Sequence, residues 1–254
     1  MPKTRLQIRL WALLLATTLA GGLTAKTTAA QASADQVVEK YLTVIGGRAA
    51  LGKVTSRRAT GTVTFSNQGG DVNGTIETDN KVPNKSRFAI KLDLSAMGQG
   101  EMSVEQRFDG TDGVMMNSLQ GNTDITGDQL QNMRNNAFPT QLLHYKEAGM
   151  TLASLPAEKV DGKDMNVVEV TPKSGPKVKM YFDAQSGLLV RQTTHINSDQ
   201  GPLDQTIDLS DYRAVGDVKV PFHVVNGTPI QTVTISYTNV EHNVPLDDSL
   251  FKKG

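Results

Sequence analysis

The sequence of 254 residues contains no cysteine. Disulfide bonds and thiolate metal sites both require this residue, so the chain can form neither. Thiol nucleophiles are excluded for the same reason, and so is a lipid anchor on a cysteine behind a leader, the anchor that bacterial lipoproteins use. A chain of this length can bury a sizeable hydrophobic core, and we expect its fold to depend on that core.

Aromatic side chains are scarce, at 5% of the residues, and neither sign of charge dominates, with 26 basic and 26 acidic residues. Four of the basic residues lie within the first 32 positions, which hold no acid. Without that segment, 22 basic and 26 acidic residues remain, a formal net charge of −4. Nucleic-acid-binding proteins usually carry a basic surface and stacking aromatic residues, so this composition argues against nucleic acid as a partner.

Residues 1–32 have the pattern of a secretory signal peptide: a basic start, a short apolar run and then small residues. The run breaks at Gly21-Gly22, short of the roughly 20 residues that a membrane-spanning helix needs. We predict cleavage before Ser33, with cleavage after Ala25 or Ala30 and an uncleaved anchor as alternatives. The protein is then periplasmic or secreted, not integral to the membrane, with residues 33–254 as a single domain.

A first helix is predicted directly after the leader. Ser33 and Gln36 have the spacing of a capping box, and apolar residues then recur every three or four positions as far as Ile45. Gly46-Gly47 ends this amphipathic segment.

Most of the remaining chain alternates apolar and polar residues with a period of two, which is typical of antiparallel strands with one wet face. Glycine-containing pairs separate several of these runs and supply the positive φ that tight turns need. We therefore predict a meander of about ten strands, with turns at Asp109-Gly110, Asp161-Gly162 and Ser186-Gly187.

One segment interrupts the meander. Thr126 and Gln129 have capping-box spacing before an amphipathic run, and Pro139 suits the first turn of a further helix containing Leu142, Leu143 and Tyr145. A long sheet with one apolar face has to curve and cover that face, and these helices are available to do so. The predicted fold is mainly β (α+β): a strongly curved antiparallel sheet that forms an open half-barrel covered by a few helices.

Residues that could carry chemistry do not gather in the sequence. The four histidines match no metal-ligand spacing, and no nucleophile elbow, dinucleotide-binding loop or phosphate-binding loop is present. We therefore predict a protein that is not an enzyme, with no catalytic residues, no metal and no cofactor. Methionine occurs nine times, compared with four histidines. Its thioether side chain suits either an irregular core or the wall of an adaptable cavity. After residue 32 the methionines are Met97, Met102, Met115, Met116, Met133, Met150, Met165 and Met180.

Two phrases, residues 181–191 and 211–222, resemble strand-turn pairs of the LolA/LolB-like superfamily, in particular of bacterial "outer membrane lipoprotein-sorting protein" homologues. The order of leader, helix, meander and helical insertion is similar too. The resemblance implies an open half-barrel that holds acyl chains between its concave face and its helices. The cavity would be lined by Val63, Phe65, Phe88, Ile90, Leu92, Met102, Val104, Phe108, Leu130, Met133, Met180 and Phe182.

The expected function is a carrier for a hydrophobic small molecule, a lipid or an acylated protein, which requires no catalysis. An alternative is an envelope interaction or sensor module that binds a protein partner, with residues 231–239 as an exposed edge strand for strand addition. An envelope hydrolase is a third hypothesis, and it requires a histidine and a carboxylate that converge in one pocket.

Overall fold

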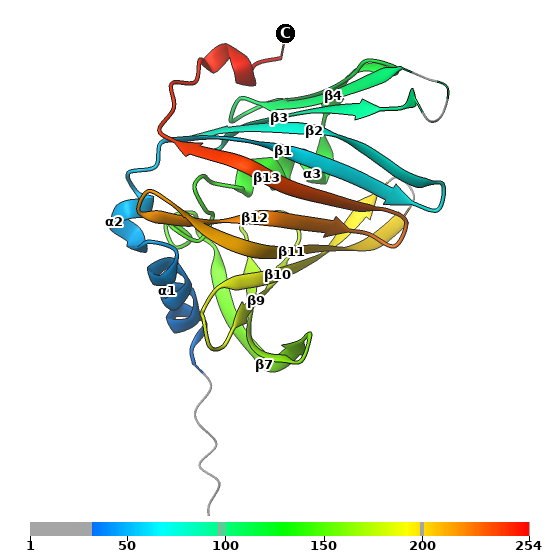
Figure 1. The fold of residues 1–254 in the computed structure, drawn as a ribbon. Helices are drawn as coiled ribbons and strands as arrows, with labels where there is room; N and C mark the ends of the chain where they lie inside the picture. The colour runs from blue at the N-terminus through cyan, green and yellow to red at the C-terminus, as the bar shows by residue number, and fades with distance from the viewer. Residues whose placement is uncertain (1–31, 96–97, 99, 199–200, 254) are drawn as a thin grey trace, which may run out of the picture. The chain divides into compact units, whose positions relative to one another are not determined.

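The computed structural model describes residues 32–95, 98, 100–198 and 201–253. The predicted leader, except for Ala32, lies outside the described residues, and the single domain at 33–254 stays a prediction. The described chain is mainly β, with a few short helices (Figure 1). Its elements are α1 (Ala34–Val44), α2 (Gly47–Leu51), β1 (Ser56–Asn67), β2 (Gly70–Lys81), β3 (Lys85–Asp93), β4 (Glu101–Phe108), β5 (Gly113–Asn117), β6 (Gly121–Ile125), α3 (Gly127–Asn135), β7 (Thr151–Val160), β8 (Lys163–Thr171), β9 (Val178–Asp183), β10 (Leu189–Ser198), β11 (Gly201–Val215), β12 (Val218–Gly227), β13 (Thr232–His242) and the 3₁₀ helix η2 (Asp248–Phe251).

The described strands form one antiparallel sheet of 13 strands in the order β6-β5-β4-β3-β2-β1-β13-β12-β11-β10-β9-β8-β7. Strands that follow one another in the sequence pair as predicted, except β6 and β7, which are the two edges of the described sheet. The first strand, β1, pairs with the last, β13. The prediction of residues 231–239 as an edge strand is wrong, because β13 lies between β1 and β12 (Figure 1). The strand order has two edges, so the described sheet is open and not closed into a barrel. It does not establish the strong curvature that we expected.

The three predicted glycine turns are confirmed. Gly110, Gly162 and Gly187 follow β4, β7 and β9, and all three have positive φ, at 106°, 79° and 78°. A side chain with a Cβ rarely adopts this backbone conformation, so glycine is the residue that lets each strand reverse within a few residues.

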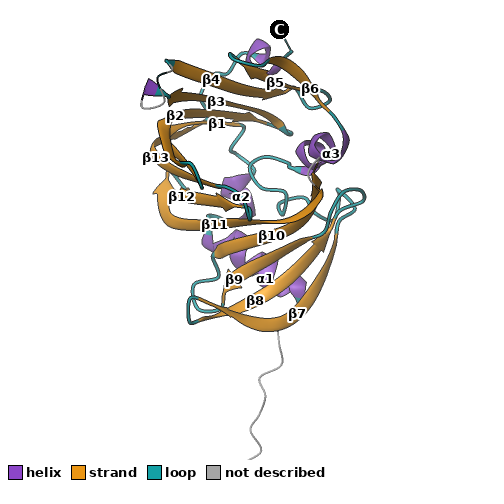
Figure 2. Ribbon diagram, turned by 90° about the vertical axis from the view of Figure 1, so that its right-hand side faces the viewer, coloured by secondary structure: helices purple, strands orange, loops and turns teal. Residues whose placement is uncertain are grey.

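Helix α1 begins as predicted, because the Ser33 hydroxyl accepts from the backbone of Gln36 and the Gln36 side chain accepts from the backbone of Ser33. Its apolar side packs on the sheet, where Tyr41 meets Phe182 edge to face at 5.4 Å between ring centroids. Figure 2 shows α1 behind β8 and β9. None of the helices in the described part of the chain is both long and apolar enough to cross a membrane.

The central segment departs from the sequence expectation. Helix α3 forms, but the capping box does not: Thr126 makes no side-chain cap, and the Gln129 amide donates to Gln106 instead, at 3.4 Å. The second helix is also wrong, since residues 141–149 form consecutive turns. The backbone hydrogen bonds of this segment span different numbers of residues: Leu143 donates to Thr140, three residues earlier, and Met150 donates to Tyr145, five residues earlier. No helical repeat is therefore sustained.

Two apolar clusters lie on the same face of the sheet. Ala59 belongs to one and Val63 to the other, and residues four apart on a strand face the same side. The larger, here called the helix-side cluster, joins α1, α2 and the 138–150 segment to the inner faces of β8, β9 and β12. The smaller, the strand cluster, comprises buried Val63, Ile76, Ile90, Leu92 and Leu94 with half-buried Phe65, Val72, Phe88, Met102, Val233, Ile235 and Tyr237.

We expect Leu42→Ala to lower the free energy of unfolding by about 2–5 kcal/mol, because this α1 side chain is only 1% exposed and its removal leaves a cavity. Leu119→Ala is the matched control, since Leu119 is 62% exposed and should change stability by less than about 0.5 kcal/mol. Urea unfolding of both variants measures the difference, and equal losses would contradict the packing of α1 described above.

Candidate functional site

The face that carries the two apolar clusters, here called the inner face, is a candidate binding surface. On β1 the inner residues are Arg57, Ala59, Gly61, Val63 and Phe65 by strand alternation. The opposite, outer face of the same region holds paired charges: Arg58 and Arg87 both bind the fully buried carboxylate of Asp79, at 2.7 and 2.9 Å. In the region of β1–β4 the sheet therefore separates an ionic outer face from an apolar inner one.

The structure brings six of the twelve predicted lining residues together in the strand cluster. Val104 lies directly beside them, because it pairs with Ile90 across β3 and β4 and faces the same side. The six are Val63, Phe65, Phe88, Ile90, Leu92 and Met102.

The other five predicted residues lie elsewhere. Met180 and Phe182 are packed into the helix-side cluster, at 1% and 0% exposure. Phe108, at the end of β4, is fully buried. Met133 and Leu130 come from α3, and they border different hollows. The twelve residues therefore do not line one continuous cavity.

Two hollows flank α3 on the inner face. One, of about 270 Å³, lies between α3 and β8–β11 and is bordered by amides and small apolar groups, including Gln141, Gln192 and Val178. The other, of about 280 Å³ and here called the Arg57 hollow, lies between α3 and β1–β4. Met133 and Asn136 border both, so α3 separates them. The Arg57 hollow is lined by Arg57, Thr78, Asn80, Asn84, Lys85, Ser86, Arg87, Phe88, Gln106, Met133, Asn136, Phe138 and Tyr237.

The sequence analysis missed Arg57. Its guanidinium carbon lies 5.3 Å from the centre of the Phe138 ring, a cation–π contact. In β1 the apolar or small residues Ala59, Gly61, Val63 and Phe65 alternate with polar ones, and the same period extended by one step toward the N-terminus places Arg57 on the apolar face.

Burial dominates the electrostatics around Arg57. Burial lowers the pKa of Arg57, and nearby Tyr237 and Tyr41 oppose that shift. His242 pairs with Arg57 across β1 and β13, and burial, followed by the positive charge of Arg57, lowers the pKa of its imidazole. Burial also raises the pKa of Tyr41 to about 12. This end of the inner face is therefore poorly solvated and favours neutral groups over additional cations.

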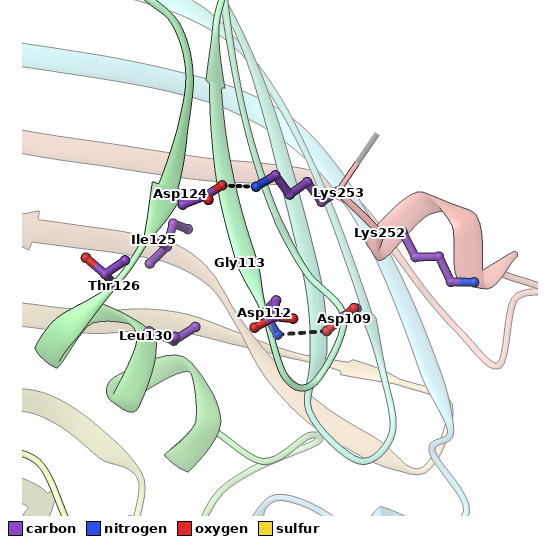
Figure 3. Close-up of a pocket in the computed structure, with 9 residues that line it drawn as sticks. All are labelled: Asp109, Asp112, Gly113, Asp124, Ile125, Thr126, Leu130, Lys252 and Lys253. Atoms are coloured by element: carbon purple, nitrogen blue, oxygen red, sulfur yellow. Dashed lines mark hydrogen bonds and ion pairs between the residues drawn. The ribbon is translucent and has the colours of Figure 1, made fainter.

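A third hollow, of about 510 Å³, lies at the β4–β5 turn and the C-terminal residues (Figure 3). Leu130 and Ile125 lie at one end of it, and the Asp109–Asp112 turn lies at the other. Lys253 pairs with Asp124 across the opening. Three acids and two lysines border this hollow beside the apolar Ile125 and Leu130, so a hydrophobic ligand would lie against several charged groups there.

The hydrolase hypothesis required a histidine and a carboxylate in one pocket, and such a pair exists. The Nδ1 atom of His195 lies 2.8 Å from Asp204 in a surface hollow, with side chains 65% and 81% exposed. Among the described residues, no serine or threonine hydroxyl bonds to His195, and a triad needs that contact. Within the same residues, no three histidines, aspartates or glutamates gather as metal ligands.

No protein-family model matches the chain, and no curated protein matches it either. Solved structures do. A LolA superfamily protein from Nitrosomonas europaea superposes with a TM-score of 0.55 at 14% identity, covering 87% of this chain and 98% of that one. The chain has a LolA-like fold.

Two further structures share the LolA-like fold. A DUF1329 family protein from Desulfovibrio piger has a TM-score of 0.56 at 14% identity over 86% of this chain and 97% of that one. A domain described as an outer membrane lipoprotein-sorting protein, from Vibrio parahaemolyticus, has a TM-score of 0.52 at 13% identity over 84% and 97%. The three superpositions, with TM-scores of 0.52 to 0.56, establish the fold, and this confirms the resemblance found in the sequence.

The lowered pKa of His242 predicts how stability responds to acid. The unfolded chain takes up a proton on this ring near the ordinary pKa of 6.5, whereas the folded ring resists it, so the free energy of unfolding falls as the pH drops below that value. The midpoint of urea unfolding should be lower at about pH 5 than at about pH 7.5, and His242→Gln should reduce this loss. His144→Gln, at an exposed histidine, should leave the loss as in the wild type. An unchanged loss in His242→Gln would contradict the assignment.

Proposed function

We propose that this chain is an exported, non-enzymatic binding or carrier protein that holds the hydrophobic part of a lipid or of an acylated protein. The ligand lies on the inner face, and the open sheet acts as a half-barrel around it. The observation that carries this proposal is the strand cluster, because two of its half-buried members, Phe88 and Tyr237, also border the Arg57 hollow beside α3.

The physical chemistry of such a carrier is simple. Each methylene moved from water to an apolar surface contributes about 0.8 kcal/mol, so a groove can hold an alkyl chain without any reactive group. The residues that border the Arg57 hollow and the strand cluster include both Phe88 and Tyr237. A chain that enters at the hollow therefore meets apolar side chains without crossing the charged outer face.

Location and fold support the same proposal. The basic start, short apolar run and small residues of positions 1–32 are the pattern of a cleaved leader, and a carrier for lipid or acylated protein works in the envelope. The solved domain described as an outer membrane lipoprotein-sorting protein has the same fold at 13% identity. Carriage of lipoproteins by this chain is part of the proposal.

The purified protein should bind the neutral fluorescent probe N-phenyl-1-naphthylamine, and dodecan-1-ol should displace it. Phe88→Gln should weaken both by roughly tenfold to a hundredfold, because a buried aromatic contact contributes about 1.5–3 kcal/mol. Fluorescence titration measures both affinities, and circular dichroism checks that the variant is folded.

Lys91→Gln is the matched control for this experiment. Lys91 lies on the same strand as Phe88, three residues further along and so on the outer face, and its side chain is 65% exposed. The affinity of the Lys91→Gln variant for the probe should equal that of the wild-type protein. Absence of probe binding to the wild-type protein would overturn the proposal.

The alternative function is an interaction or sensor module that binds a partner by strand addition. It requires an edge strand other than residues 231–239, which lie inside the sheet. The described sheet ends at β6 and β7, and β7 is mostly exposed along its ten residues. Strand addition of a protein partner at β7 would leave lipid binding unnecessary. A stable envelope partner captured without lipid would favour this function.

A further inference from the structure

Arg57 differs from the arginines around it in having no ionic partner. Arg58, Arg87 and Arg107 lie on the outer face, and each binds a carboxylate, at 2.7, 2.5 and 2.7 Å. Arg57 is the inner-face neighbour of Arg58 on the same strand. Among the described residues, the side chain of Arg57 makes no hydrogen bond and no salt bridge, and its guanidinium lies over the Phe138 ring. A half-buried cation without a counter-ion is unusual, because its partial desolvation is not compensated.

The guanidinium of Arg57 is accessible from the hollow. No side-chain nitrogen or oxygen in the described part of the chain is both buried and unpartnered. Because the nitrogen atoms of Arg57 have no partner, they must reach open space, and the Arg57 hollow is bordered by this residue. The five N–H groups of the guanidinium are therefore available to a ligand.

The rest of the hollow favours an anion. None of its 13 bordering residues is an aspartate or a glutamate. The other two cationic residues that border the hollow belong to β3 and alternate with Phe88, so their side chains lie on the outer face. They are neutralised there, because Lys85 binds Asp248 and Arg87 binds Glu77, Asp79 and Glu105. Neutral side chains beside Arg57 can donate hydrogen bonds to an oxyanion: Thr78, Asn80, Ser86, Gln106 and Asn136.

The hollow is also continuous with the apolar surface. Phe88 and Tyr237 border the hollow and belong to the strand cluster. On β1 the inner residues between Arg57 and Val63 are Ala59 and Gly61, which are small. The Cα atoms of Arg57 and Val63 are about 20 Å apart at about 3.3 Å per residue, so the cation stands at one end of an extended apolar row.

We infer that the Arg57 hollow binds the anionic head of an amphiphile, a carboxylate or phosphate that carries an alkyl chain, with its oxygens on the guanidinium of Arg57 and its chain along the strand cluster. A planar guanidinium donates two parallel hydrogen bonds to such an oxyanion, which a lysine cannot do. The inference rests on the proposed function, because it specifies the class of lipid that the inner face takes.

The test compares three ligands that share a twelve-carbon chain: dodecanoate, dodecyl phosphate and neutral dodecan-1-ol. All three displace N-phenyl-1-naphthylamine, which is itself uncharged. The wild-type protein should bind the two anions about tenfold to a hundredfold more tightly than the alcohol, the range of a charge-assisted hydrogen bond. Inorganic phosphate and acetate, which lack the chain, should not displace the probe at the same concentrations.

Substitutions then assign the preference to Arg57. Arg57→Gln should remove the preference for the anions, measured as the ratio of the affinity for dodecanoate or dodecyl phosphate to the affinity for dodecan-1-ol. Arg57→Lys, which keeps the charge but not the paired donors, should retain part of the preference. Lys91→Gln removes one positive charge from the outer face and should keep the wild-type preference, which controls for net charge.

The possible failures are distinguishable. A wild-type protein that binds neither alcohol nor anion removes the proposed function and this inference together. Equal binding of alcohol and anions leaves the carrier function and overturns the inference, and this comparison needs no variant, so it holds even where Arg57→Gln does not fold. Displacement by inorganic phosphate as strong as that by dodecyl phosphate would identify a site for free anions and overturn the assignment of an amphiphile.

Discussion

The pairing of β1 with β13 holds the sheet together, and the other features depend on it. These strands are the first and the last along the chain in the described sheet. Their register runs from Arg57 opposite His242 to Ser66 opposite Thr232. Without this ladder the chain would be two separate meanders, β1–β6 and β7–β13. A long-range ladder is costly to form because a large loop must close before its hydrogen bonds are made. Once formed, it places both apolar clusters on one continuous face, with Tyr237 of β13 in contact with each.

Local features of the fold could be predicted from the sequence. The Ser33–Gln36 capping box, the alternating strands and the three glycine turns each depend on residues a few positions apart, and local sequence is sufficient for them. The pairing of β13 with β1 could not be predicted, because alternation defines which face a strand presents and not which strand lies beside it. The exposed edge predicted at residues 231–239 was wrong for this reason.

The central segment shows a second limit. Thr126 and Gln129 have the correct spacing for a capping box, yet Gln129 bonds to Gln106 on β4, a tertiary partner that no local pattern reveals. Leu142, Leu143 and Tyr145 are spaced as in a helix, and all three are buried, although their backbone forms turns. This segment therefore covers the sheet as expected, but without the expected helix. For the site, six of twelve residues came together because they share the inner face of β1–β4, whereas those on α3 and β9 depended on packing across the sheet.

Arg57 shows why histidines and sequence motifs do not indicate a candidate binding site of this kind. A charged residue at an inner position contradicts the alternation that identifies the strand, so it reads as the end of the pattern. On the outer face the same residue type satisfies Asp79 and Glu105 and stabilises a polar surface. On the inner face it has an aromatic neighbour and a hollow that contains no acid. Local rules are broken at functional sites more often than elsewhere, because a group kept unsatisfied in the free protein is available to bind a ligand. In this LolA-like fold, the unpaired cation next to an apolar row therefore argues for a ligand that has both a charged head and a hydrophobic chain.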